Sequence, residues 1–248
     1  MTVLRVILGD QLSHSISRLE GCDKKNDVFL MCEVWEEATY VKHHKKKIAI
    51  IFSTMRHFAE ELKDQGYQVY YTKLEDPKNT GSFRGEVERA IKQHAINKIV
   101  VTYPGEYRVL QDLRQWEQAF RLPVDIREDN RFLCSPDDFK EWSESRKQLR
   151  MEYSYREMRK KYSILMNGKV PIGGQWNYDA ENRKSPKESL TIPPTYQVKP
   201  NALTQEVMTL VNERFDDHFG DLEPFHFVVT RDQALVALNQ FIDQRLAH

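Results

Sequence analysis

The chain has 248 residues, and its 37 Lys and Arg residues equal its 37 Asp and Glu residues, so the formal net charge at pH 7 is zero. This balance excludes an overall electrostatic preference for nucleic acid or membranes, so any such preference must be local. The length predicts one complete domain and a second, smaller one.

The sequence lacks the usual signals of membrane insertion and secretion. No window approaches the roughly 20 apolar residues that span a membrane, and no signal peptide precedes the first predicted strand. Cys22, Cys32 and Cys134 are odd in number, far apart and without metal-site spacing. We therefore expect reduced thiols and a cytoplasmic protein.

Short apolar runs alternate with amphipathic segments over the first 135 residues. Runs rich in Val, Ile and Leu are typical of buried strands, whereas apolar residues at steps of three and four are typical of helices. The predicted strands cover residues 3–8, 28–34, 67–74, 98–103 and 123–127, and the predicted helices cover a short segment through residue 19, then 43–65, 83–94 and 106–120. Such alternation requires crossover connections. We expect an α/β domain over residues 1–135, with a five-stranded parallel, Rossmann-like sheet and helices on both faces.

The composition changes after residue 135. Helices are predicted over 136–144 and 146–162, and residues 140–161 contain eight basic and four acidic side chains. Because 167–200 is rich in Gly and Pro and has no periodicity, we interpret residues 136–203 as a helical and irregular interdomain linker.

Helices resume over residues 204–215 and 231–246. Two or three amphipathic helices cannot bury their own apolar faces. We therefore expect residues 204–248 to begin a helical domain whose remainder lies outside this chain. Exposed faces of this kind would also allow two chains to associate.

Polar side chains follow the first two predicted strands. Open α/β sheets bind ligands beyond the carboxyl ends of their strands and against helix N-termini. The candidates for such a site are Gly9, Asp10 and Gln11 after the first strand, Cys32, Glu33, Glu37 and Tyr40 after the second, and Ile51 on the following helix. Gly permits close backbone approach, and Asp accepts hydrogen bonds from a heterocycle or a ribityl chain. In the alternative interpretation, Asp10 caps the next helix, Glu37 is solvated, and Ile51 packs on the sheet.

The His and Lys residues that follow these candidates do not indicate a metal site. Adjacent helical residues such as His43 and His44 diverge by about 100°, and no third ligand lies at a useful spacing. We interpret Lys45, Lys46 and Lys47 as a solvent-exposed face, with a phosphate clamp as the alternative. The absence of GxGxxG, GKS/T and GxSxG motifs removes the usual nucleotide and hydrolase sites.

A second cluster of polar and aromatic residues lies within the predicted linker. Trp stacks on bases, and Asn, Arg and Lys bind base edges or phosphates. The candidates for nucleic-acid or interdomain contacts are Arg146, Arg150, Trp176, Asn182, Arg183 and Lys184. The alternative is a linker that Trp176 pins across the first domain.

Five segments together suggest a family. They are LGDQL at residues 8–12, EEATYVKHHKKKI at 36–48, MRHF at 55–58, RKQLRMEY at 146–153 and GQWNYDAENRK at 174–184. On these motifs the chain resembles the photolyase-related proteins, the bacterial iron–sulfur cryptochromes and (6-4) photolyases. The resemblance implies an α/β antenna domain, a long linker and a helical domain that holds FAD and a four-cysteine [4Fe–4S] cluster and binds damaged DNA.

The resemblance also implies a ligand for the first cluster. In the family, 6,7-dimethyl-8-ribityllumazine lies at the ends of the first two strands, where Gly9, Asp10 and Glu37 match. The FAD pocket and the cluster cysteines have no positions within residues 1–248. The parent protein would be a light-driven DNA repair enzyme or photoreceptor whose antenna passes excitation to the flavin, and this chain alone would be inactive. The alternative is a non-catalytic adaptor that binds a small molecule or nucleic acid.

Overall fold

The computed structural model describes residues 1–180, 185 and 193–246, and the chain forms two compact units. The first unit combines Met1–Asp129 with Pro194–His248, and the second is Asn130–Pro193. The C-terminal helices therefore group with the N-terminal residues. The predicted domain limits at residues 135 and 203 stay predictions.

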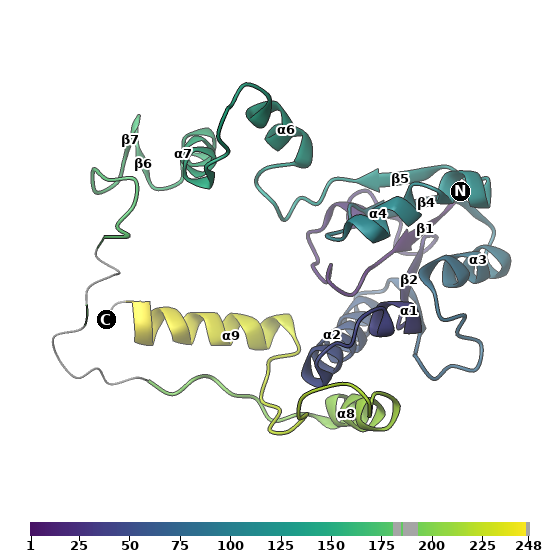
Figure 1. Cartoon of the computed structure of the whole chain (residues 1–248). Helices are drawn as coiled ribbons and strands as arrows, with labels where there is room; N and C mark the ends of the chain where they lie inside the picture. Colours follow the sequence, from purple (N-terminus) through teal and green to yellow (C-terminus); the bar gives the residue numbers. More distant parts are fainter. Residues whose placement is uncertain (181–184, 186–192, 247–248) are drawn as a thin grey trace. The chain divides into compact units, whose positions relative to one another are not determined.

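The first unit is built on a five-stranded, all-parallel sheet with helices around it (Figure 1). The strands lie in the order β3-β2-β1-β4-β5, so the chain runs from β1 to one edge and then crosses to the other. Leu4 pairs with Val28 on one side and with Ile99 on the other. The strands are β1 (Thr2–Val6), β2 (Val28–Cys32), β3 (Gln68–Thr72), β4 (Ile96–Thr102) and β5 (Val124–Arg127). The predicted α/β, Rossmann-like fold is confirmed.

Each face of the sheet carries its own apolar core, because strand residues point alternately to the two faces. Leu4 and Val6 belong to one core, and Ile7 and Phe29 belong to the other. The first core is covered by α3 (Phe83–Gln93), α4 (Tyr107–Leu113) and α5 (Trp116–Phe120), and the second by α2 (Lys45–Asp64). The predicted helices on both faces are therefore present.

The C-terminal helix α8 (Ala202–Arg214) packs against α2. Val207 and Val211 of α8 are fully buried in the core that α2 covers. The next helix, α9 (Arg231–Phe241), continues into a π-helical turn at Ile242–Leu246, and neither contains a buried residue. Association between chains through this exposed face stays a prediction. Within the described part of the chain, no helix combines the length and the apolar character needed to cross a membrane.

Two predicted elements near the strand ends differ from the structure. The predicted polar turn after β2 contains a short helix, α1 (Trp35–Thr39), so Glu37 lies on helical backbone. The predicted helix ending at residue 19 is only one 3-10 turn, Ser17–Leu19. In both places local backbone hydrogen bonds, rather than an apolar stripe, define the helix. Apolar periodicity therefore could not predict where these two short helices begin and end.

The predicted helix over residues 106–120 is two helices, α4 and α5. The N–H of Gln115 donates to the carbonyl oxygen of Asp112, three residues back, instead of the oxygen four residues back. The indole Nε1 of Trp116 donates to Asp112 Oδ2 at 2.9 Å. This tighter turn interrupts the helix but keeps Trp116 in the core, where it is fully buried.

The second unit contains two helices and a small hairpin. Its elements are α6 (Pro136–Glu144), α7 (Met151–Tyr162), β6 (Met166–Asn167) and β7 (Val170–Pro171). A capping box formed by Ser135 and Asp138 starts α6 where the sequence predicts. The helix predicted from residue 146 begins only at Met151. The segment predicted to be irregular includes the β6–β7 turn, where Gly168 has a φ of 58° that favours glycine.

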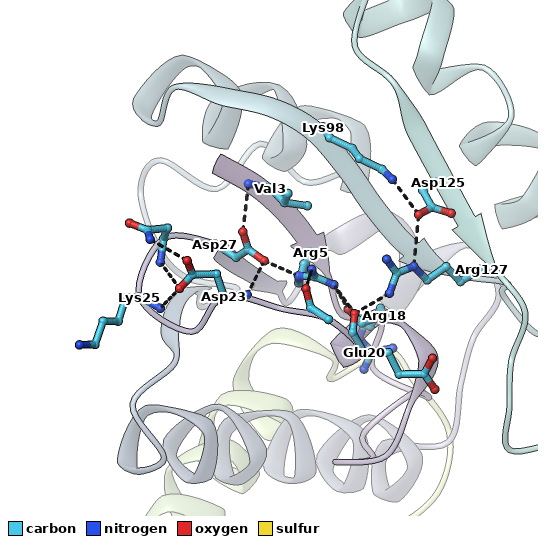
Figure 2. A network of polar contacts seen from close by, with 12 residues as sticks. Val3, Arg5, Arg18, Glu20, Asp23, Lys25, Asp27, Lys98, Asp125 and Arg127 are labelled. Atoms are coloured by element: carbon cyan, nitrogen blue, oxygen red, sulfur yellow. Dashed lines mark hydrogen bonds and ion pairs between the residues drawn. The ribbon is translucent and has the colours of Figure 1, made fainter. Parts of the chain in front are cut away.

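A buried ion pair fixes the loop between β1 and β2 (Figure 2). Arg5 Nε donates to Asp27 Oδ2 at 2.7 Å, and both side chains are 4% exposed. The Arg5 guanidinium also donates to the carbonyl oxygens of Arg18 and Gly21. Asp27 in turn accepts from the N–H of Val3 at 3.3 Å. These bonds hold the loop against β1 and so position the start of β2.

A second buried ion pair joins the end of β2 to α2. Arg56 donates to Glu33 from Nε at 2.6 Å and from Nη2 at 3.0 Å. Glu33 is 1% exposed, and it also accepts from the Tyr71 hydroxyl at 2.6 Å and the Leu74 N–H at 2.8 Å. Arg56 Nη1 donates to Glu206 of α8 at 2.8 Å. One arginine therefore connects a strand end, α2 and α8.

We expect Glu33→Ala to lower the free energy of unfolding by about 3–5 kcal/mol, because it leaves a buried guanidinium without its main partner. Urea unfolding followed by circular dichroism measures this change. Glu60→Ala, at an exposed position of α2, is the control and should change the stability by less than about 0.5 kcal/mol. Equal stabilities for the two variants would contradict a central role for the pair.

A buried carboxylate also fixes the start of α3. Glu86 is fully buried and accepts from Arg89, from the Thr72 hydroxyl at 2.8 Å and from the Thr80 N–H at 2.8 Å. Burial opposes its ionisation, but these hydrogen bonds outweigh burial and hold the pKa of Glu86 below its usual 4.5. The stability that the ionised form contributes is present above that pH and is lost as the pH falls through the lowered pKa.

We therefore expect the chain to lose stability as the pH falls below about 4.5, in part through Glu86. Glu86→Gln keeps the shape of the side chain but cannot ionise. Its unfolding free energy should be lower at pH 7 and should fall less between about pH 5 and pH 3 than that of the parent. Urea titrations across this range test the difference. An unchanged pH dependence would show that Glu86 is not a source of the acid sensitivity.

Candidate functional site

A cavity of about 140 Å³ lies at the carboxyl edge of the sheet. Segments that follow β1, β2 and β4 line it, so it lies where the strand order reverses between β1 and β4. This switch point is the usual ligand site of open α/β sheets. The fold therefore places the cavity where a ligand is expected.

The inner part of the cavity is apolar, because the buried residues of its lining are mainly hydrophobic. They are Leu8, Cys32, Val34, Ala38, Ile48, Phe52, Met55, Pro104 and Val109. A Cβ atom at Gly9 would come within 2.8 Å of Met55 Sδ and 3.1 Å of Ile51 Cγ2. A side chain at Gly9 would therefore have to displace Met55, and glycine allows the segment after β1 to lie close to α2.

The outer part of the cavity is polar and more exposed. Its polar residues are Asp10, Glu37, Tyr40, His43, Lys47 and Glu106. Arg108 is not part of the lining, but it donates to both carboxylate oxygens of Glu37, at 2.9 and 2.7 Å. The hydroxyl of Tyr40 donates to Glu106 Oε1 at 3.2 Å. The cavity therefore has an apolar interior below a polar rim that offers carboxylate acceptors together with the Lys47 ammonium as a donor.

Six of the eight predicted ligand-site residues line this cavity. They are Gly9, Asp10, Cys32, Glu37, Tyr40 and Ile51. Gln11 lies outside it, because its Nε2 donates to the carbonyl oxygens of Thr102 and Tyr103 at 3.2 and 3.1 Å. Glu33 also lies outside, held by Arg56 as described above. Contact of any of these eight residues with a ligand stays a prediction, and for Gln11 and Glu33 the bonds observed are internal.

The part of the cavity that follows β4 was not predicted from the sequence. Pro104, Gly105, Glu106 and Val109 belong to it. Pro104 and Gly105 were visible as the end of a strand, but only the strand order places β4 next to β1. His43 and Lys47, interpreted as surface residues, also line the cavity, while His44 caps α2 by accepting from the Lys46 N–H at 3.0 Å.

The cavity changes the ionisation of three lining residues. Burial, reinforced by Glu86, raises the pKa of the Cys32 thiol well above its usual range, so this thiol stays protonated. Burial and the neighbouring Lys47 lower the pKa of His43. Burial and the hydrogen bond to Glu106 raise the pKa of Tyr40. At neutral pH these three side chains are therefore mainly uncharged, and each can take part in hydrogen bonds.

The second predicted cluster lies in the second unit. Three cations of α7 surround the Trp176 ring: Arg156 at 5.4 Å, Arg159 at 5.5 Å and Lys160 at 5.3 Å from its centroid. A neighbouring cavity of about 900 Å³ is lined by Tyr155, Tyr178 and Trp176, among others. Trp176 therefore packs on α7 within its own unit, through cation–π contacts.

The other predicted residues of this cluster are not all placed beside Trp176. Arg146 donates to Glu157 at 2.8 Å and lies over the Trp142 ring at 4.6 Å. Arg150 is exposed at the N-cap of α7. Asn182, Arg183 and Lys184 lie outside the described residues.

The cysteines and acidic residues do not form an evident metal centre. Over residues 1–180, 185 and 193–246, no three or more His, Cys, Asp and Glu side chains gather in a way that could hold a metal ion. Cys22, Cys32 and Cys134 are free thiols.

Comparison with known proteins identifies the family. A family model described as "Deoxyribodipyrimidine photo-lyase-related protein" matches residues 5–227. The chain is 52% identical over 248 residues to a (6-4) photolyase of Agrobacterium fabrum, an alignment that covers 100% of this chain and 49% of that relative. It is 24% identical over 193 residues to uncharacterized protein R852 of Acanthamoeba polyphaga mimivirus, covering 75% of this chain and 95% of that protein.

The family match covers both units and extends to the segment beyond α8. The chain spans about half the length of the (6-4) photolyase that it matches. The residues that line the cavity and those that surround Trp176 lie within the segments matched by the family model and by this relative. The chain belongs to the family of deoxyribodipyrimidine photolyase-related proteins.

Proposed function

We propose that this chain is the antenna part of a light-driven DNA photolyase or cryptochrome-like photoreceptor. Its cavity would bind 6,7-dimethyl-8-ribityllumazine, which absorbs light and passes excitation to FAD. The observation that carries this proposal is the cavity itself, which combines an apolar interior with an acceptor-rich rim at the switch point of the sheet. Membership of the photolyase-related family supports it.

The residues of the cavity suit the two chemically different parts of this ligand. Ile51 and Met55 of α2 and Val34 after β2 offer an apolar surface for the ring and its methyl groups. Asp10 and Glu37 are acceptors for hydroxyl and N–H groups of the ribityl chain and ring edge. Cys32 stays a neutral thiol and adds no charge. In this role the protein positions the chromophore and excludes water, while the chromophore supplies the photochemistry.

The activity that we propose for the whole protein is inferred from the relative and not from the cavity. The matched relative is a (6-4) photolyase, and about half of its length has no counterpart in this chain. We place the FAD site and a [4Fe–4S] cluster of the parent protein outside residues 1–248. Damaged DNA would be the substrate of a repair enzyme, and the helical domain that holds FAD would be the partner of this chain.

We expect the chain to bind the lumazine, detected as absorbance that remains after gel filtration. Asp10→Ala and Glu37→Ala should each weaken binding about tenfold to a hundredfold, because hydrogen bonds to charged groups contribute about 1.5–3 kcal/mol. Fluorescence titration gives the dissociation constants.

Glu117→Ala is the matched control, because Glu117 is exposed on α5 and lies outside the cavity lining. Its affinity for the lumazine should equal that of the parent. Failure of the parent to bind, or parental affinity in both Asp10→Ala and Glu37→Ala, would contradict the proposed ligand site.

The second unit would contribute to DNA binding in the parent protein. The observation that favours this role is the cluster of α7 cations and aromatic rings around Trp176, with Arg150 exposed at the start of the same helix. Cations bind phosphates without regard to sequence, and aromatic rings stack on unpaired bases. The zero net charge of the whole chain makes this a local property.

We expect Arg150→Gln with Lys160→Gln to weaken binding of this chain to single-stranded DNA. The plot of log affinity against log salt should become shallower by about 1 for each phosphate contact that is lost. Fluorescence anisotropy at several salt concentrations measures the slope. Lys92→Gln, on α3 of the first unit, is the control and should keep the parental slope. A slope unchanged in the double variant would contradict a phosphate-binding role for α7.

A further inference from the structure

Four side chains form a connected network at the rim of the cavity, which we call the mouth strap: Glu37, Tyr40, Glu106 and Arg108. Arg108 binds both oxygens of Glu37, at 2.9 and 2.7 Å, and reaches Glu106 Oε2 at 3.3 Å. Its guanidinium also lies over the Tyr40 ring, 4.5 Å from the centroid. Since the Tyr40 hydroxyl donates to Glu106, the side chains of Tyr40, Glu106 and Arg108 each contact the other two, and Glu37 joins them through Arg108.

The mouth strap joins two segments that are far apart in the sequence. Glu37 and Tyr40 belong to α1 and its C-cap, after β2, whereas Glu106 and Arg108 belong to the start of α4, after β4. Three of the four, all except Arg108, line the cavity. The contacts therefore cross the cavity rim from one side of β1 to the other.

Arg108 is the cation that makes this crossing favourable. Without it, the carboxylates of Asp10, Glu37 and Glu106 would share the same rim without the positive charge that Arg108 brings to two of them. A planar guanidinium can bind one carboxylate in bidentate fashion, reach a second and stack on an aromatic ring at the same time. The hydrogen bond to Glu37 holds the pKa of Arg108 above its usual range, as expected for a guanidinium in an ion pair.

We propose that Arg108 is a positioning residue of the ligand site, which fixes Glu37 and closes the cavity rim through the mouth strap. As a statement about a ligand it rests on the proposed function, because Glu37 is one of the acceptors assigned there. Each carboxylate oxygen keeps a free acceptor site after binding Arg108. Arg108 thus orients Glu37 without blocking it, and a ligand enters when the strap opens.

Cys32 provides a readout of this opening that needs no ligand. Its side chain lines the cavity and is 3% exposed, whereas Cys22 and Cys134 are partly exposed. In the closed cavity this thiol is shielded and protonated, so a small neutral maleimide reacts with it only when the strap opens and solvent allows the thiol to ionise. Peptide mapping by mass spectrometry follows the three thiols separately, so Cys22 and Cys134 serve as internal controls in every experiment.

We expect Arg108→Gln to raise the rate of Cys32 alkylation about two- to fivefold, the range that a partly exposed ion pair supports. The rates at Cys22 and Cys134 should not change. Glu106→Gln, which keeps the bidentate pair with Glu37 but weakens the rest of the strap, should give a smaller increase. Arg114→Gln is the matched control, because Arg114 is an exposed arginine just beyond α4 and outside the cavity lining.

The proposal is overturned if Cys32 reacts at the same rate in Arg108→Gln and Arg114→Gln. It is also overturned if all three thiols of Arg108→Gln react faster, since that result would indicate general loosening. Both outcomes are independent of lumazine binding. Failure of the strap and failure of the proposed ligand are therefore distinguishable.

Discussion

The ion pair between Glu33 and Arg56 is the interaction on which the cavity depends. It joins the end of β2, whose next residues enter α1, to the middle of α2, whose neighbouring residues Ile51 and Met55 line the cavity. Both side chains are almost fully buried, so neither can be removed without leaving the other poorly solvated. The same arginine binds Glu206 and so ties α8 to α2.

The strand order gives this edge of the sheet its chemical character. Since β1 lies between β2 and β4, the segments after these three strands meet at one place. Each contributes an acidic side chain to the rim: Asp10, Glu37 and Glu106. Their mutual repulsion is offset by Arg108, which belongs to the segment after β4 but binds the one after β2. The cavity therefore combines a buried apolar interior with a charged rim, and the rim is the part that can open.

Periodicity and turn chemistry were enough to predict the sheet and α2. The strand ends followed by Gly9 and Asp10 or by Glu37 and Tyr40 offered candidates for a ligand site, which the family resemblance then favoured over their structural alternatives. Periodicity and turn chemistry could not predict which polar residues form hydrogen bonds within the chain instead of lining the cavity. Gln11 and Glu33 are polar and follow strand ends, as the polar residues of the cavity do. They nevertheless form hydrogen bonds within the chain, Gln11 with Thr102 and Glu33 with Arg56. The segment after β4 contributes to the cavity only because β4 lies beside β1, and this strand order is not visible in the sequence. The packing of α8 on α2 likewise depends on contacts between residues about 150 positions apart, such as Arg56 with Glu206.

A crystal structure of this chain with 6,7-dimethyl-8-ribityllumazine is the most direct test of the central claim that the cavity at the switch point is a chromophore site. We predict electron density for the ring beside Ile51 and Met55 of α2, with polar groups of the ligand within hydrogen-bond distance of Asp10 or Glu37. A cavity that stays empty at saturating ligand, or a lumazine bound elsewhere on the chain, would contradict the account.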